Sequence, residues 1–143
     1  MRVAVGTDEA GATPDAVVRW LRDAGHEVVD PGGGVADGTA EWPEVGRLVA
    51  EAVAGGDADI GVVCCWTGTG VSIAANKVAG VRAALCTDVA TASGARRWND
   101  ANVLALGLRL TTPVLATEIC AAFLDGVPDE DEHAAIERVE LRP

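Results

Sequence analysis

Short continuous apolar runs alternate with longer segments of helical periodicity along the chain. The runs predict β-strands over Arg2–Gly6, His26–Asp30, Ile60–Cys65, Val81–Cys86 and Val103–Leu106. Strands without polar alternation are typical of a sheet that helices cover on both faces. The pattern therefore predicts an α/β fold, a three-layer domain with a mainly parallel five-stranded sheet.

The segments between the strands carry helix start and stop signals. Thr13 and Pro14 predict a first helix, with a hydroxyl at the cap and Pro at the first helical position, and Gly25 predicts its end. Further helices are predicted from Trp42 to the Gly55-Gly56 pair and over Val71–Val78, Val89–Trp98 and Pro113–Leu124. Residues 125–140 hold seven acidic side chains and one Arg, which predicts a polar terminal helix. The expected organisation is one domain over residues 1–125 and an acidic helix or tail over residues 126–143.

The net charge and the spacing of the cysteines argue against several classes of protein. The chain has 22 acidic and 11 basic side chains, and a net charge of -11 argues against nucleic acid as a partner. It holds no run of 18 apolar residues, and the apolar run that ends before Asp8 is too short for a signal peptide, so neither a membrane nor export is expected. Its four cysteines show no zinc or disulfide spacing, which favours free thiols in the cytoplasm and no metal site.

Three loops are candidates for a site, because ligands of open α/β sheets bind beyond the carboxyl ends of the strands. The sequence is expected to bring Thr7–Ala12, Cys65–Gly70 and the Trp98–Asn99 region to that edge. The first loop carries the adjacent carboxylates of Asp8 and Glu9, which fit either a binding site or a solvated turn.

The second loop has the more specific composition. Its glycines let backbone N–H groups approach a ligand oxygen, and a thiol at Cys65 precedes hydroxyls at Thr67, Thr69 and Ser72. A thiolate beside such donors could abstract a proton next to a carbonyl, although a tight turn with a buried cysteine explains the same residues. The loop lacks both the GK[ST] ending and the GxGxxG pattern of nucleotide sites, so no nucleotide cofactor is expected.

These motifs resemble one known family. Cys65–Lys77 (CWTGTGVSIAANK), Gly80–Ala83 (GVRA) and Trp98–Gly107 (WNDANVLALG), with Gly6–Gly11 and Glu41–Pro43, are similar to the ribose-5-phosphate isomerase B and galactose-6-phosphate isomerase subunit family, over about residues 1–125. The resemblance implies a Rossmann-like fold and aldose–ketose isomerisation through an enediolate, without metal or other cofactor. It also implies a homodimer or a dimer of dimers, with sites for a sugar or sugar-like substrate shared between subunits.

Residue roles follow from the same resemblance. Cys65 matches the cysteine that moves the proton, Thr67 and the Gly-rich backbone match the groups that stabilise the enediolate, and Asp8 matches an aspartate near the sugar ring. Asn99 and Arg109 match residues that reach the site from the partner subunit. The other candidate substrate-binding residues are Glu9, Trp42, Trp66, Gly68, Thr69, Gly70, Ser72 and Trp98.

The chain differs from the family at the positions of the residues that bind the substrate phosphate and of the residue that opens the sugar ring. The family has His at the positions of Glu9 and Trp98, the second being the ring-opening group, and Gly at the position of Trp66. The stretch Asp129–Ile136 offers acids where relatives carry phosphate-binding Arg. Because acids repel a phosphate dianion, the sequence predicts a substrate range altered away from phosphorylated pentoses. Two alternatives stay open, an ordinary ribose 5-phosphate isomerase and a non-catalytic or partner-dependent sugar-binding subunit.

Overall fold

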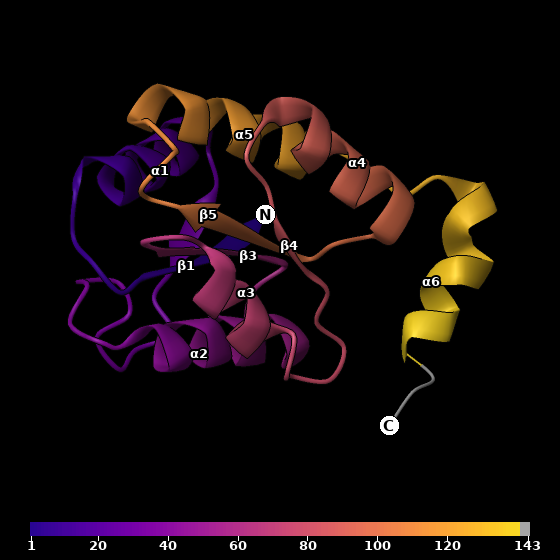
Figure 1. The fold of residues 1–143 in the computed structure, drawn as a ribbon, viewed down its shortest axis with the longest axis horizontal. Helices are drawn as coiled ribbons and strands as arrows, with labels where there is room; N and C mark the ends of the chain where they lie inside the picture. The colour runs from indigo at the N-terminus through magenta and orange to yellow at the C-terminus, as the bar shows by residue number, and fades with distance from the viewer. Residues whose placement is uncertain (141–143) are drawn as a thin grey trace.

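The computed structural model describes residues 1–140 and contains a five-stranded sheet in which every pairing is parallel (Figure 1). The strands are β1 (Arg2–Thr7), β2 (Glu27–Val29), β3 (Ile60–Cys65), β4 (Ala83–Leu85) and β5 (Val103–Gly107). Their order across the sheet is β2-β1-β3-β5-β4. The predicted fold class, an α/β domain with a parallel sheet, is confirmed.

Helices cover both faces of this sheet. They are α1 (Ala12–Asp23), α2 (Trp42–Ala54), α3 (Thr69–Ala75), α4 (Val89–Asn99) and α5 (Pro113–Asp125), followed by the 3₁₀ turn η1 (Glu130–Glu132) and α6 (His133–Glu140). Helices α1, α4 and α5 lie on one face, and α2 and α3 lie on the other (Figure 1).

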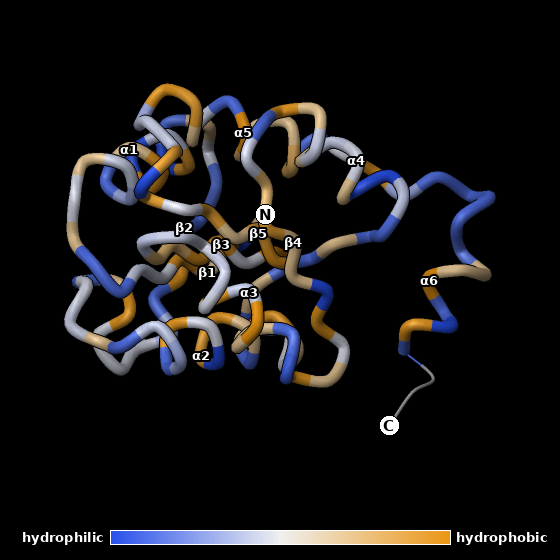
Figure 2. Tube along the Cα trace, viewed as in Figure 1, coloured by the Kyte–Doolittle hydropathy of each residue, from blue (hydrophilic) through white to orange (hydrophobic). Residues whose placement is uncertain are grey.

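The two faces have separate cores, because successive strand residues point in opposite directions. In β3, Val62 and Cys64 pack with α1, α4 and α5, whereas Val63 and Cys65 pack with α2 and α3. The apolar positions accordingly concentrate in the strands at the centre of the molecule (Figure 2).

Several predicted element boundaries were wrong. Helix α1 begins at Ala12, so Thr13 lies inside it, where its buried hydroxyl donates 3.0 Å to the carbonyl of Thr111 instead of capping the helix. Strand β4 is shorter than predicted and covers only Ala83–Leu85. The backbone of its first residue, Ala83, pairs with the side-chain amide of Asn76, which accepts from the Ala83 N–H at 2.8 Å and donates to the Ala83 carbonyl at 2.9 Å. Asn76 follows the last turn of α3, which ends before the predicted Val78.

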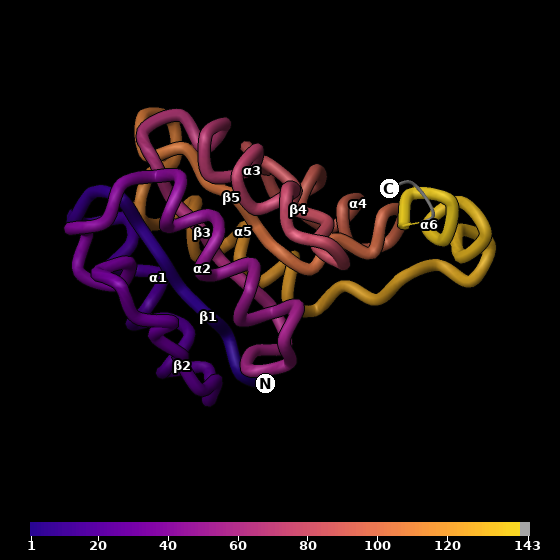
Figure 3. The backbone as a smooth tube through the Cα atoms, turned by 90° about the horizontal axis from the view of Figure 1, so that it is seen from below, coloured from indigo at the N-terminus to yellow at the C-terminus, as the bar shows by residue number. Residues whose placement is uncertain are grey.

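The acidic C-terminal segment stands apart from the layered body. Helix α6 projects beyond α4 in both views of the backbone (Figures 1 and 3), and none of its residues is buried. The polar helix predicted over residues 125–140 is shorter in the structure, with a 3₁₀ turn over Glu130–Glu132 and an α-helix over His133–Glu140. The last part of the predicted tail, 141–143, lies outside the described residues. Across residues 1–140, every helix is too short or too polar to cross a bilayer.

Candidate active site

The switch point of the sheet lies between β1 and β3. The chain leaves β1 toward β2 on one side and returns to β3 on the other, and in such sheets the crevice at the carboxyl ends of these strands is the usual ligand site. Register pairs Thr7 with Cys64, so Asp8 and Cys65 follow side by side. The amide of Asp8 donates a hydrogen bond of 3.2 Å to the carbonyl of Cys64, which ties the two loops together.

Asp8 lies in a partly desolvated position. Its Oδ1 atom is buried without a hydrogen-bond partner among the described residues. Burial raises the pKa of the Asp8 carboxyl above its ordinary value, and the charge of Glu9 raises it further. The backbone of Glu9 is fixed by the Thr7 hydroxyl, which donates to the Glu9 carbonyl at 2.7 Å and accepts from its N–H at 3.3 Å, while the Glu9 side chain is exposed.

The two adjacent cysteines occupy different environments. Cys64 is fully buried on the α5 side, and burial raises the pKa of its thiol well above the ordinary value. Cys65 ends β3 on the opposite face, with 5% of its surface exposed at the edge where the loop begins. Of the two, only Cys65 has any exposed surface.

Two glycines let the loop after Cys65 lie directly on the end of β5. Gly68 has φ +76°, a left-handed conformation, and a Cβ there would come within 2.9 Å of the Gly107 amide nitrogen. A Cβ on Gly107 would lie 2.6 Å from the carbonyl oxygen of Thr67. This close approach leaves the hydroxyls of Thr67 and Thr69 exposed and 2.8 Å apart, so the pair can bind a ligand oxygen together.

Exposed aromatic side chains and one cation flank this loop. The ring of Trp42 covers Gly70, since a Cβ at Gly70 would lie 2.9 Å from the Cδ2 and Cε3 atoms of the indole. The carbonyl of Trp66 accepts a 2.9 Å hydrogen bond from the Arg109 amide. Trp42 and Trp66 are 44% and 55% exposed, so their faces are available for stacking. The backbone of Arg109 therefore lies at this edge, and its expected role in the site of a partner subunit stays a prediction.

The expected position of the third loop was wrong. Trp98 and Asn99 lie in the last turn of α4, a helix that starts after β4 and runs back along the sheet for about 16 Å. The next residue, Asp100, bonds to Arg82 just before β4, at the amino ends of the strands. A parallel strand–helix unit always returns its helix to that edge, and this reasoning could have located Trp98 and Asn99 from the sequence.

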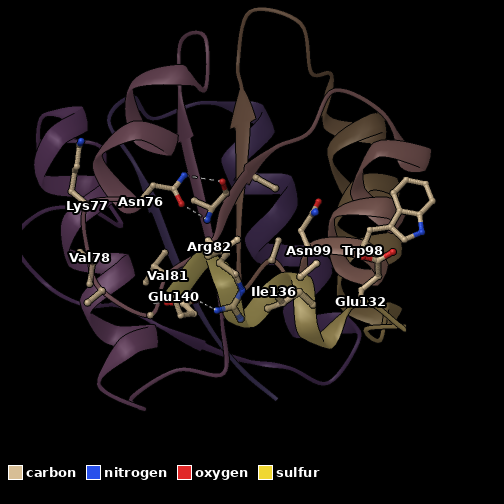
Figure 4. Close-up of a pocket in the computed structure, with 17 residues that line it drawn as sticks. Asn76, Lys77, Val78, Val81, Arg82, Trp98, Asn99, Glu132, Ile136 and Glu140 are labelled. Atoms are coloured by element: carbon tan, nitrogen blue, oxygen red, sulfur yellow. Dashed lines mark hydrogen bonds and ion pairs between the residues drawn. The ribbon is translucent and has the colours of Figure 1, made fainter. Parts of the chain in front are cut away.

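A large cavity lies at this amino edge, away from Cys65. It measures about 830 Å³ and is lined by Asn76–Ala84, the end of α4 and one side of α6 (Figure 4). Trp98 and Asn99 face it together with Ile136 and Glu132 of the C-terminal segment. Within residues 1–140, no three His, Cys, Asp or Glu side chains are arranged to hold a metal ion.

Fold and site together define a doubly wound α/β enzyme with a cysteine and a carboxyl group at its switch point. Residues 3–140 match the family model described as Ribose/Galactose Isomerase. The chain is similar to ribose-5-phosphate isomerase B of Escherichia coli, with 40% identity over 92% of this chain and 89% of the other. It is also similar to the D-erythrulose-4-phosphate isomerase of Pectobacterium atrosepticum, with 37% identity over 87% and 83%.

A solved structure extends the likeness to the backbone. The ribose-5-phosphate isomerase B of Clostridium thermocellum superimposes with a TM-score of 0.89 at 37% identity, over 98% of this chain and 95% of the other. The chain belongs to the Ribose/Galactose Isomerase family and is a sugar-phosphate isomerase of the ribose-5-phosphate isomerase B type.

Proposed function

We propose that the chain interconverts an aldose and a ketose with Cys65 as the base. The observation that carries the proposal is the junction of Asp8 with the Cys65 strand at the switch point, beside the exposed hydroxyls of Thr67 and Thr69. The Cys65 thiolate takes the proton from C2 of the open-chain aldose, the electron pair moves into the C1–C2 bond, and the carbonyl oxygen becomes an enediolate oxygen. Return of the same proton to C1, together with transfer of the hydroxyl proton from O2 to the enediolate oxygen O1, completes the ketose.

The other groups at this edge stabilise the intermediate. Thr67 and the backbone N–H groups after Gly68 donate to the enediolate oxygen, a contribution that is commonly the largest in such reactions. Asp8 exchanges a proton with a substrate hydroxyl, a role that its raised pKa favours. The exposed faces of Trp42 and Trp66 pack against the sugar carbons.

Trp98 and Asn99 contact substrate only in the site of a second subunit, according to this proposal. Within one chain they lie at the opposite edge of the sheet from Cys65, which supports a homodimer or dimer of dimers with shared sites. Residues 1–125 would form the isomerase domain, and residues 126–143 would form an acidic appendage.

We further propose that the substrate is not a phosphorylated pentose. Trp98 has no titratable group with which to open a sugar ring, so a substrate that is already open-chain is favoured. Glu9 adds a negative charge next to Asp8, which opposes a phosphate dianion, while Arg109 is the cation at the same edge. A tetrose 4-phosphate cannot form a five-membered ring and is therefore open-chain, as this argument requires. An isomerase named for D-erythrulose 4-phosphate is among the relatives.

A panel of sugars in D2O tests the reaction. It also separates the effect of ring opening from the effect of phosphate charge on the choice of substrate. D-ribose 5-phosphate is cyclic and charged, D-erythrose 4-phosphate is acyclic and charged, and D-ribose is cyclic and neutral. We expect deuterium at C1 or C2, measured by NMR, fastest with erythrose 4-phosphate, and none with Cys65→Ala. Failure of all sugars to exchange would contradict the isomerase proposal.

Two outcomes of the same panel favour the alternatives. Efficient turnover of ribose 5-phosphate would identify an ordinary ribose 5-phosphate isomerase, which the 40% identity to the Escherichia coli enzyme supports. Sugar binding without exchange would identify a non-catalytic or partner-dependent subunit. Glu9→Gln, with Glu118→Gln on α5 as the control, isolates the charge effect, since only the former should lower KM for phosphorylated sugars.

A further inference from the structure

An unusual backbone conformation ends α4 directly after Trp98 and Asn99. Asp100 has φ 44° and ψ 45°, the sole positive φ outside glycine in residues 1–140. This left-handed conformation is unfavourable for a residue with a Cβ, so other contacts must hold it. The Asp100 carboxylate is bound by two guanidinium groups, by Arg96 at 2.9 Å and by Arg82 at 3.0 Å.

Arg82 connects this helix end to two other elements. Its Nε atom donates 2.8 Å to the Asp100 carbonyl, and its backbone N–H donates 2.8 Å to the side chain of Asn102 before β5. A third group, Nη1, pairs with the carboxylate of Glu140 in α6 (Figure 4). Only 18% of the Arg82 side chain is exposed, so water screens these contacts less than it screens ordinary surface pairs.

A second arginine ties the start of the C-terminal segment to the same helix turn. The Arg97 guanidinium binds the Asp129 carboxylate at 2.9 and 3.2 Å, and the Asp129 amide donates 2.8 Å to the Arg97 carbonyl. The same guanidinium lies 5.9 Å from the centre of the Trp98 ring, within cation–π range. Residues 129–140 are thus held at both ends, by Arg97 and by Arg82.

We propose that Arg82 is a positioning residue that, with Arg97, braces α6 against the end of α4 and thereby fixes Trp98 and Asn99. The brace spans the 830 Å³ cavity that these side chains face. This inference rests on the proposed function, in which Trp98 and Asn99 contact substrate bound to a second subunit. Neither arginine touches the crevice at Cys65, so they act through the residues that they hold.

Helix α6 depends on the brace because it has little else to hold it. It is eight residues long, too short to be stable alone, and has no buried residue. Three of its four apolar side chains, those of Ala135, Ile136 and Val139, line the cavity wall. Loss of the Glu140 pair should therefore free the helix, while Asp129 still tethers its start.

Hydrogen–deuterium exchange of four variants tests the brace without reference to activity. We expect Glu140→Gln to accelerate exchange of the α6 amides about 5-fold, a size typical of one partly screened ion pair, and to leave the Asp100 and Ala101 amides protected. Arg82→Gln should accelerate both sets, because it also releases Asp100. Arg82→Lys should fall between, since an ammonium cannot reproduce the forked contacts of a guanidinium. Glu137→Gln is the matched control, because it removes the same charge from α6 at a residue without an ion pair in residues 1–140.

Steady-state kinetics then test the positioning role. With the substrate identified by the sugar panel, Arg82→Gln should raise KM about 5-fold and leave kcat within about 2-fold, as expected for lost binding contacts. Glu140→Gln should raise KM by a smaller factor, because Asp100 stays held by Arg82 and Arg96. Equal exchange in Glu140→Gln and Glu137→Gln would overturn the brace whatever the activity. Faster exchange with an unchanged KM would overturn the positioning role. If the unmodified chain turns over no sugar, the proposed function fails. The amide hydrogen–deuterium exchange of the variants then decides by itself whether Arg82 and Arg97 brace α6.

Discussion

The amide of Asp8 donates a 3.2 Å hydrogen bond to the carbonyl of Cys64, which joins the loop after β1 to the end of β3. This bond extends the parallel ladder one residue beyond the pairing of Thr7 with Cys64. It brings a carboxyl group with a raised pKa next to the residue pair Cys64 and Cys65, of which only the second has any exposed surface. The site therefore depends on strand register as much as on residue type.

The Asp8 carboxyl should make stability depend on pH. Because its folded pKa is raised, the folded state binds the proton more tightly than the unfolded chain, whose carboxyl titrates near 3.8. Stability from this group is present at low pH and is lost as pH rises from about 3.8 through the raised value. Asp8→Asn, which keeps the shape without the charge, should have a higher melting temperature than the unmodified chain above that window and the same or a lower one below it. A difference in melting temperature that is constant from pH 3.5 to about 7 would contradict the assignment.

The four cysteines should differ in their reactivity toward iodoacetamide. Burial raises the pKa of Cys86 and of Cys120 to about 12, and that of Cys64 still higher. At pH 8 a thiol of pKa 12 is a thiolate in about one molecule in ten thousand, so these three react slowly in the folded chain. Cys65, at the crevice, should be alkylated at least about ten times faster.

Peptide mass mapping after timed alkylation measures this order. The control is the chain unfolded in urea, in which all four thiols should react at similar rates. Alkylation of Cys64 as fast as Cys65 in the folded chain would show that the assignment of the two thiols to opposite sheet faces is wrong.

Much of the fold could be predicted from the sequence because helices cover both faces of the sheet, which makes each strand a continuous apolar run. Five apolar runs then mark five strands regardless of which residues pair. Two of the misplaced boundaries lie where a side chain bonds to backbone outside its own element, at Asn76 with Ala83 and at Thr13 with Thr111. Such contacts depend on tertiary geometry and leave no periodic signal.

Some contacts of the candidate site could likewise be predicted from the sequence, and others could not. Asp8 directly follows β1 and Cys65 is the last residue of the neighbouring parallel strand β3, so their approach could be predicted from the pattern. The contacts of Arg82 could not be predicted, since its partners Asp100 and Glu140 lie 18 and 58 positions further along the chain and in other elements. The GVRA motif marked Arg82 as part of a family resemblance, but only the structure gives it partners.

Gly68 and Gly56 offer a matched test of how tightly the loop after Cys65 is packed. Both have positive φ, +76° and +80°, but a Cβ on Gly56 meets nothing within 4 Å, whereas one on Gly68 would meet Leu85 at 2.5 Å and Gly107 at 2.9 Å. Gly56→Ala should therefore cost about 1 kcal/mol in free energy of unfolding, the cost of left-handed backbone alone. Gly68→Ala should cost about 3 kcal/mol, because the contact with β5 backbone adds overpacking. Urea denaturation measures both, and equal costs would show that the loop can move away from β5.

The contact of Trp42 with Gly70 should be visible as an energetic coupling between them. A Cβ at Gly70 would lie 2.9 Å from two atoms of the indole, so Gly70→Ala must displace the ring or the first turn of α3. We expect a loss of about 1–3 kcal/mol in free energy of unfolding for Gly70→Ala in the unmodified chain. In a Trp42→Ala background the same substitution should be nearly neutral, since Ala favours a helix more than Gly does. The double-mutant cycle, measured by urea denaturation, isolates this contact from the general effect of the substitution. A cost that is the same in both backgrounds would mean that the indole yields without resistance and does not support the loop that carries Thr67 and Thr69.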